Sequence, residues 1–169
     1  MPAPRVLVAG IGNIFFGDDG FGVEVIRRMA AVPVPDSVKV VDFGIRGVHL
    51  AYELLDGYDA LVLIDALPVG EEPGTVVLVE AELPDAPRAG DDIAPTIEAH
   101  SMNPALVLGM LASLGGHVDS ILVIGCQPLT IEEGIGLSAP VEAAVDHAVE
   151  AVSDVLADLF ATAGEETPA

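Results

Sequence analysis

The sequence has few basic residues: Lys and Arg number 6 against 27 Asp and Glu, and the formal net charge is −21. Such a charge repels phosphate backbones and anionic lipid, so we expect neither a nucleic acid nor a membrane surface as a partner. It attracts cations or a basic protein surface instead. Nearly all the acids fall at positions that we expect to face solvent, where they keep the chain soluble.

Aromatic residues, cysteine and long apolar runs are also scarce. Aromatics make up 4% of the chain, with no tryptophan, while 51% of residues are hydrophobic, so aliphatic side chains must fill the core, as in layered α/β proteins. The single cysteine, Cys126, has no partner for an internal disulfide, which suits a reducing cytosol. No run reaches the ~18 apolar residues of a membrane-spanning helix, and no signal-peptide cleavage site follows the first residues. We therefore expect a cytoplasmic protein. No strong oligomer interface is readable in the sequence, so we expect a monomer that meets a large partner.

Short apolar runs alternate with helical spacings along the chain. The runs predict strands at 5–9, 38–43, 60–64, 74–79 and 121–126, with helices that begin near Phe21, Val48, Pro104 and after Ser138. Only about nine residues separate the third and fourth strands, too few for a parallel crossover, so the fourth should run antiparallel at an edge. The sequence thus predicts a three-layer α/β sandwich with a mostly parallel, twisted sheet of about five strands flanked by helices. We expect one domain at 1–161 and a frayed or disordered tail at 162–169.

Polar residues follow the predicted parallel strands. They are Asn13, Asp18 and Asp19 after the first strand, Asp42 at the second and Asp65 at the third. Because ligands bind beyond the carboxyl ends of parallel strands, these residues should converge on one edge of the sheet, with His100 brought there by a long loop. Carboxylates held together raise one another's pKa values, and a cation relieves their repulsion. The pattern therefore predicts a metal site.

Each of these residues also has a structural interpretation. Asp18 or Asp19 can cap the helix that begins near Phe21, and we expect a division in which Asp18 or the backbone closes the turn while Asp19 reaches the ligand. Asp65 interrupts an apolar run, where a carboxylate is seldom mere solvated surface, so a functional role is favoured. A lone histidine such as His100 is more often a surface or core residue than a ligand.

The segment Gly10-Ile11-Gly12 invites comparison with the dinucleotide fingerprint G-x-G-x-x-G. Phe15 stands where the third glycine is required, and Asp18 and Asp19 would face an anionic pyrophosphate. Asp42 resembles the acid that binds the ribose in dinucleotide-binding proteins, but this single match is a weak signal. A dinucleotide-binding enzyme is therefore the least favoured alternative.

A series of short motifs stands in fixed order over about residues 5–155. They are Gly10-Ile11-Gly12-Asn13, Gly17-Asp18-Asp19-Gly20-Phe21-Gly22, Asp42 with Gly44 and Gly47, Leu63-Ile64-Asp65-Ala66, His100, Gly125 and Gly136-Leu137-Ser138. Together they resemble the nickel–iron hydrogenase maturation endopeptidases. That resemblance implies a peptidase that removes a short C-terminal peptide from the hydrogenase large-subunit precursor after nickel insertion.

The resemblance also implies a set of site residues. By motif, nickel would be bound by Asp19, Asp65 and His100, and it would arrive with the precursor. Asp19 is one methylene shorter than the glutamate of some members. Such a metal can polarise the scissile carbonyl and lower the pKa of a bound water, with Asp19 or Asp65 as general base. Metal-assisted and aspartic-type mechanisms both stay open.

Two further points bear on function. In the loop after the second strand, Ile45 stands where the family that this chain resembles more often has threonine. The next residue, Arg46, either binds the substrate's carboxylates or is a solvated loop residue. A non-catalytic, nickel-binding maturation chaperone with the same three ligands is the alternative function. The sequence shows neither a Ser-His pair nor a setting that would make the cysteine reactive. Serine-protease and thiol-protease chemistry are therefore not supported.

Overall fold

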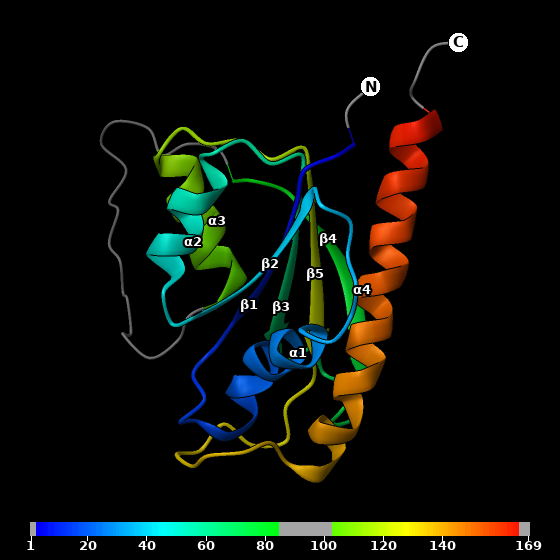
Figure 1. Cartoon of the computed structure of the whole chain (residues 1–169). Coiled ribbons are helices and arrows are strands. Elements are labelled where there is room, and N and C mark those ends of the chain that lie inside the picture. Colours follow the sequence, from blue (N-terminus) through cyan, green and yellow to red (C-terminus); the bar gives the residue numbers. More distant parts are fainter. Residues whose placement is uncertain (1–2, 85–102, 166–169) are drawn as a thin grey trace.

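The computed structural model describes residues 3–84 and 103–165, which contain a five-stranded sheet in the order β2-β1-β3-β5-β4 (Figure 1). The strands are β1 (Val6–Ile11), β2 (Val38–Gly44), β3 (Ala60–Ala66), β4 (Val76–Ala81) and β5 (Ser120–Cys126). β4 pairs antiparallel with β5 at one edge, and the other neighbouring pairs are parallel. The predicted mostly parallel sheet with an antiparallel edge strand is confirmed.

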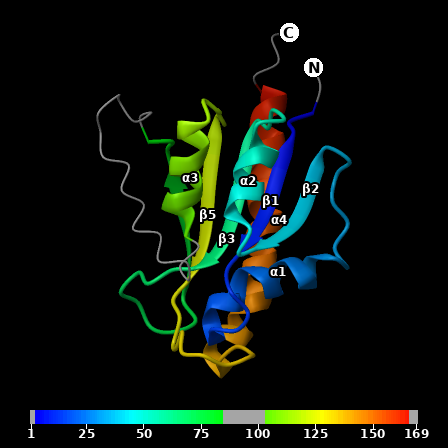
Figure 2. The ribbon, with the colours of Figure 1, turned by 90° about the vertical axis from the view of Figure 1, so that its left-hand side faces the viewer.

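Helices cover both faces of this sheet. α1 (Phe21–Met29) and α4 (Ala139–Glu165) pack on one face, and α2 (Gly47–Leu54) and α3 (Pro104–Ser113) pack on the other (Figure 2). Alternate strand residues point to opposite faces. Val6 and Val8 therefore join the core under α1 and α4, while Leu7 and Ala9 join the core under α2 and α3. The three-layer sandwich is confirmed.

A local signal sets the start of α3, and the last helix runs further than the sequence predicts. The Asn103 side chain accepts a hydrogen bond from the N–H of Leu106 at 2.9 Å, and Pro104 occupies the first turn, so α3 begins where its capping signal predicts. α4 continues to Glu165, four residues into the tail expected at 162–169. The helical propensity of its last alanines, Ala161 and Ala163, accounts for the extension.

The order of the strands creates a topological switch point. The chain passes from β1 to β2 through α1 on one face and from β2 to β3 through α2 on the other face, so β1 lies between β2 and β3. In open α/β sheets, ligands bind at such a point, outside the carboxyl ends of the strands. That edge lies at the bottom of Figure 1.

Two expectations from composition can be compared with the structure. Cys126 is buried on β5, and burial, together with the charge of Asp18, raises the pKa of its thiol to about 11. Among residues 3–84 and 103–165, no helix combines the length and hydropathy needed to cross a membrane.

Candidate active site

Three glycines bring the segment after β1 close to the end of β3. A Cβ on Gly22 would collide with the carbonyl oxygen of Ile64, and one on Gly10 would collide with the carbonyl oxygen of Gly22. Gly12 has a φ of 134°, and a Cβ there would meet the carbonyl oxygen of Asp19. Only glycine permits these approaches. They allow α1 and the preceding 3₁₀ turn η1 (Gly17–Gly20) to pack directly on the switch point.

Asp65 lies in β3 next to its last residue and is only 2% exposed. Its Oδ1 atom is buried and has no hydrogen-bond partner within residues 3–84 and 103–165. Burial raises the pKa of this carboxyl well above its ordinary value, the charge of Asp19 raises it further, and the N–H of Ala66 offsets part of the shift. An unsatisfied buried carboxylate oxygen is costly. A cation or a hydrogen-bond donor placed beside this atom would offset that cost.

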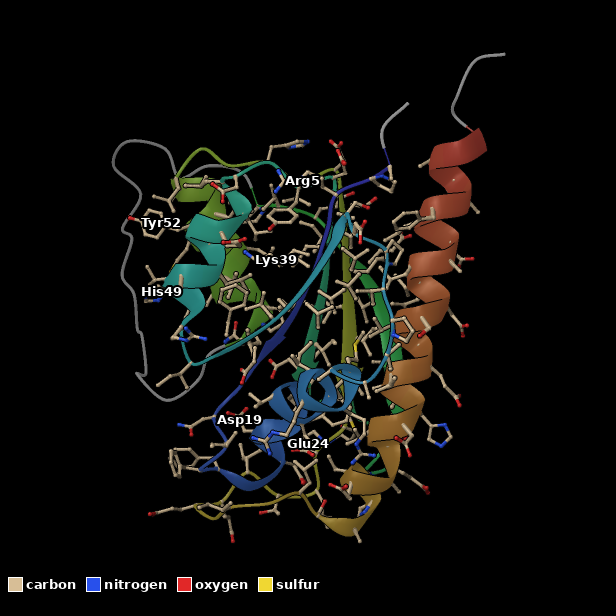
Figure 3. All side chains as sticks on the ribbon, in the orientation of Figure 1. Arg5, Asp19, Glu24, Lys39, His49 and Tyr52 are labelled. Atoms are coloured by element: carbon tan, nitrogen blue, oxygen red, sulfur yellow. The ribbon has the colours of Figure 1, made fainter. Side chains whose placement is uncertain are left out.

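Asp19 lies in η1 and is partly buried. Its Oδ2 accepts a hydrogen bond from the N–H of Asn13 at 2.8 Å. Burial raises the pKa of Asp19, and the bond from Asn13 opposes that shift. Figure 3 shows Asp19 below the end of β1, at the same edge of the sheet. A Cβ on Gly12 would contact both the Asp19 backbone and Asp65 Oδ1, so the structure brings these two predicted site residues to the same place.

Asp18 does not cap α1, and that interpretation was wrong. Gly20 is the N-cap, with no side-chain capping bond. The Asp18 carboxylate is fully buried and accepts four hydrogen bonds at 2.7–3.1 Å, from the N–H groups of Leu129, Thr130 and Ser138 and the hydroxyl of Ser138. Burial alone would raise its pKa, but these donors together lower it. Asp18 therefore ties η1 to the loop after β5, and these four donors occupy its carboxylate.

The predicted convergence of all the strand-end carboxylates is also wrong for Asp42. This residue is exposed on the edge strand β2 and lines a groove with Ile26 and Met29 of α1. Arg46 donates to the carbonyl oxygens of Asp42 at 2.6 Å and Phe43 at 3.2 Å, so it braces the loop. Its contact with substrate carboxylates stays a prediction.

His100 lies outside the described residues. Within residues 3–84 and 103–165, no group of three or more His, Cys, Asp and Glu side chains could hold a metal ion. The described part of the site therefore supplies two carboxylates, from Asp19 and Asp65. Its unpartnered buried oxygen fits a divalent cation, for which such donors are suitable ligands.

Sequence reasoning missed the role of the loop between β5 and α4. The helix predicted to begin after Ser138 does so: Ser138 directly precedes α4, and its carbonyl oxygen accepts from the N–H of Glu142 at 2.8 Å. Its second role, holding Asp18, has no local signature because the two residues are 120 positions apart.

The fold and the paired carboxylates define an α/β protein with an acidic site at its switch point, and comparisons identify its relatives. The family model described as hydrogenase maturation protease matches residues 23–155. The hydrogenase expression/formation protein HupD of Rhizobium leguminosarum bv. viciae is 36% identical over 157 residues, covering 92% of this chain and 75% of that protein. HupD of Bradyrhizobium diazoefficiens is 35% identical over 159 residues, covering 91% and 79%.

Solved structures agree. The hydrogenase maturating endopeptidase HybD from E. coli superimposes with a TM-score of 0.71 at 28% identity, covering 91% of this chain and 93% of that one. The hydrogenase 2 maturation peptidase of Thaumarchaeota archaeon SCGC_AB-539-E09 gives 0.68 at 32% identity, covering 90% and 98%. This chain belongs to the hydrogenase maturation protease family, which makes it a peptidase.

Proposed function

We propose that this peptidase removes a C-terminal peptide from a nickel-loaded precursor of the large subunit of a nickel–iron hydrogenase, the final step of its maturation. The observation that carries the proposal is the Asp19–Asp65 pair at the switch point, with the unpartnered Oδ1 of Asp65. Membership of the family supports a substrate of this kind. We further expect the enzyme to work in the cytoplasm, as a monomer that meets a large partner.

Nickel enters this proposal as part of the substrate. Asp19 and Asp65, with His100 as the third ligand implied by the resemblance, form a donor set that suits a borderline divalent ion. A cation at this position offsets the repulsion between the two carboxylates, which otherwise adds to the raised pKa of Asp65. When bound, the metal polarises the scissile carbonyl. Precursor without nickel lacks this attraction, so the site discriminates between immature and loaded substrate.

The two carboxylates have unequal environments, which suits a division of roles. Asp19 is partly exposed and is held by the N–H of Asn13, so it can reach substrate and cation from a fixed position. Asp65 is buried, its pKa is the more strongly raised, and it is the stronger base of the pair. Proton acceptance from the attacking water by Asp65 follows from this order.

The test uses purified large-subunit precursor, loaded with nickel or free of it, incubated with the peptidase and followed by intact-protein mass spectrometry. Loss of a C-terminal peptide from the loaded form alone is the expected result. Equal cleavage of both forms contradicts nickel recognition, and an unchanged mass for both forms contradicts the peptidase role toward this substrate.

A further inference from the structure

Two neighbouring loops expose a set of large apolar side chains beside Asp19. Their exposed fractions range from 40% to 80%, and they are Ile14, Phe15, Leu129, Ile131 and Ile135. We refer to these five residues as the apolar platform. Monomeric proteins seldom gather exposed apolar side chains without a binding role.

Backbone hydrogen bonds hold the two loops of the platform together. Gly134 donates to the carbonyl oxygen of Phe15, and Gly17 donates to that of Gly134, each at 2.8 Å. The N–H of Asp18 donates to Thr130 at 3.0 Å, and the buried Asp18 carboxylate adds the bonds described above. The platform is therefore a braced surface rather than two free loop tips, and a partner need not order it on binding.

The platform is continuous with the candidate active site. Asn13, whose N–H holds Asp19, directly precedes Ile14 and Phe15. In Figure 1 the segment after β1 and the loop after β5 run together along the edge where the parallel strands end. A polypeptide that reaches Asp19 and Asp65 therefore passes beside these side chains.

The charge around the apolar platform indicates which kind of partner binds it. The two segments that carry the platform, residues 13–17 and 129–138, contain no Lys or Arg, whereas Glu132 and Glu133 are exposed between its apolar residues. A second copy would bring another net charge of −21 against this one, which disfavours self-association. The complementary partner presents an apolar surface bordered by basic side chains.

We propose that the apolar platform is the docking surface for the large-subunit precursor, which binds it through an apolar surface with a basic rim next to the cleavage site. This inference rests on the proposed function, because it assigns the place where the same substrate binds. It assigns docking of the precursor to the platform, and nickel recognition and chemistry to the two aspartates.

The experiment compares two double variants in a cleavage assay with purified nickel-loaded precursor. Ile131→Thr/Ile135→Thr removes apolar contact from the platform. Leu78→Thr/Val79→Thr is the matched control, since these side chains on β4 are 55% and 44% exposed and threonine suits a strand. We expect the platform variant to raise KM and the directly measured Kd by roughly tenfold or more, with kcat unchanged, because uniform binding is lost. The control should match wild type.

A single variant, Ile135→Lys, guards against loss of folding, because Ile135 is 80% exposed and can be replaced without disturbing the core. It should retain the wild-type Tm and weaken binding, since lysine repels the basic rim. Unchanged Kd and KM in both platform variants would overturn the docking assignment while leaving the cleavage reaction standing. A wild-type dimer in sedimentation that both variants convert to monomer would also overturn it, because the occupant would then be a second copy. Failure of wild type itself to cut the precursor would instead reject the proposed function.

Discussion

Asp18 and Asp65 are both buried aspartates on adjoining segments of one edge of the sheet, yet they differ in what surrounds their oxygens. Asp18 is fully buried and accepts four hydrogen bonds, which lower its pKa against the effect of burial. Asp65 is 2% exposed, one of its oxygens has no partner in the described part of the chain, and burial raises its pKa well above the ordinary value. Burial alone therefore does not distinguish a structural acid from a reactive one.

Asp18 and Asp65 differ in the hydrogen-bond donors that surround their carboxylates. The loop after β5 provides N–H groups that satisfy the Asp18 carboxylate, so this residue contributes to folding. Among residues 3–84 and 103–165, no comparable donor set surrounds Asp65, so its burial destabilises the fold and a bound ligand can offset that cost. The following experiments test this contrast, from the largest expected effect to the smallest.

Asp65→Asn should abolish most peptidase activity while leaving the fold intact. Removing the base and one carboxylate ligand should lower kcat by about 10²–10⁴-fold, whereas loss of a desolvated charge should not lower the free energy of unfolding. Mass-spectrometric cleavage rates and urea unfolding measure the two quantities. Asp36→Asn, at an exposed position, is the control and should keep full activity. Near-normal cleavage by Asp65→Asn would mean that the protein acts through other groups, and binding of nickel-loaded precursor without cleavage by wild type would favour the chaperone alternative.

Asp18→Asn should show the reverse pattern, with stability as the main loss. The amide nitrogen replaces an acceptor that faces N–H donors, so we expect the free energy of unfolding to fall by about 3 kcal/mol. Calorimetry should then show a Tm lower by roughly 10 °C. A stability equal to that of wild type would contradict the bracing role of Asp18.

The pH dependence of stability should have opposite signs in the two variants. The pKa of Asp18 is lowered by folding, so its contribution is present above the unfolded value of about 3.9 and is lost as pH falls toward the folded value. The pKa of Asp65 is raised by folding, so its ionisation costs stability as pH rises from about 3.9 through the folded value.

Urea unfolding of wild type and both variants between pH 3 and pH 8 measures this difference. The deficit of Asp18→Asn should be full at neutral pH and shrink below about pH 4. The advantage of Asp65→Asn should be absent at the acid end and grow toward neutral pH. Subtracting wild type removes the background from the other acidic groups. Parallel curves for the two variants would show that the carboxylates do not differ in the way described.

Ser138→Ala should give the smallest effect, because it removes one of the four donors to Asp18 and leaves the backbone N–H in place. We expect a loss of about 1.5 kcal/mol in unfolding free energy, since the acceptor is charged. Ser113→Ala is the matched control, because that hydroxyl donates to the carbonyl oxygen of Gly109, one turn earlier on the exposed surface of α3. Equal losses in the two variants would remove the reason for assigning a special role to Ser138.

Much of the fold could be predicted because its determinants are local. The capping preference of Asn103 predicts where α3 begins. The connection between β3 and β4 is too short for a parallel crossover, so β4 must run antiparallel. The rule for parallel strands also predicted that Asp19 and Asp65 share one edge. Each of these inferences needs only neighbouring residues or a connection length.

The remaining features depend on contacts between distant segments. The donors to Asp18 lie 111–120 positions away, so the capping preference of an aspartate before a helix gave the wrong role. Asp42 was misplaced because strand ends show which edge a residue occupies but not the direction of its side chain. The role of His100 stays a prediction from family resemblance.

The Asp18 bonds also have a consequence for biosynthesis. The segment that carries Asp19 is anchored by Ser138, directly before α4, so the chain must be made through residue 138 before this anchor exists. Because domains fold as units during synthesis, a nascent or truncated chain that ends before Ser138 lacks the brace beneath its first carboxylate. Proteolytic competence is thus expected to appear only after Ser138 has been synthesised, which keeps shorter nascent chains from acting on precursors.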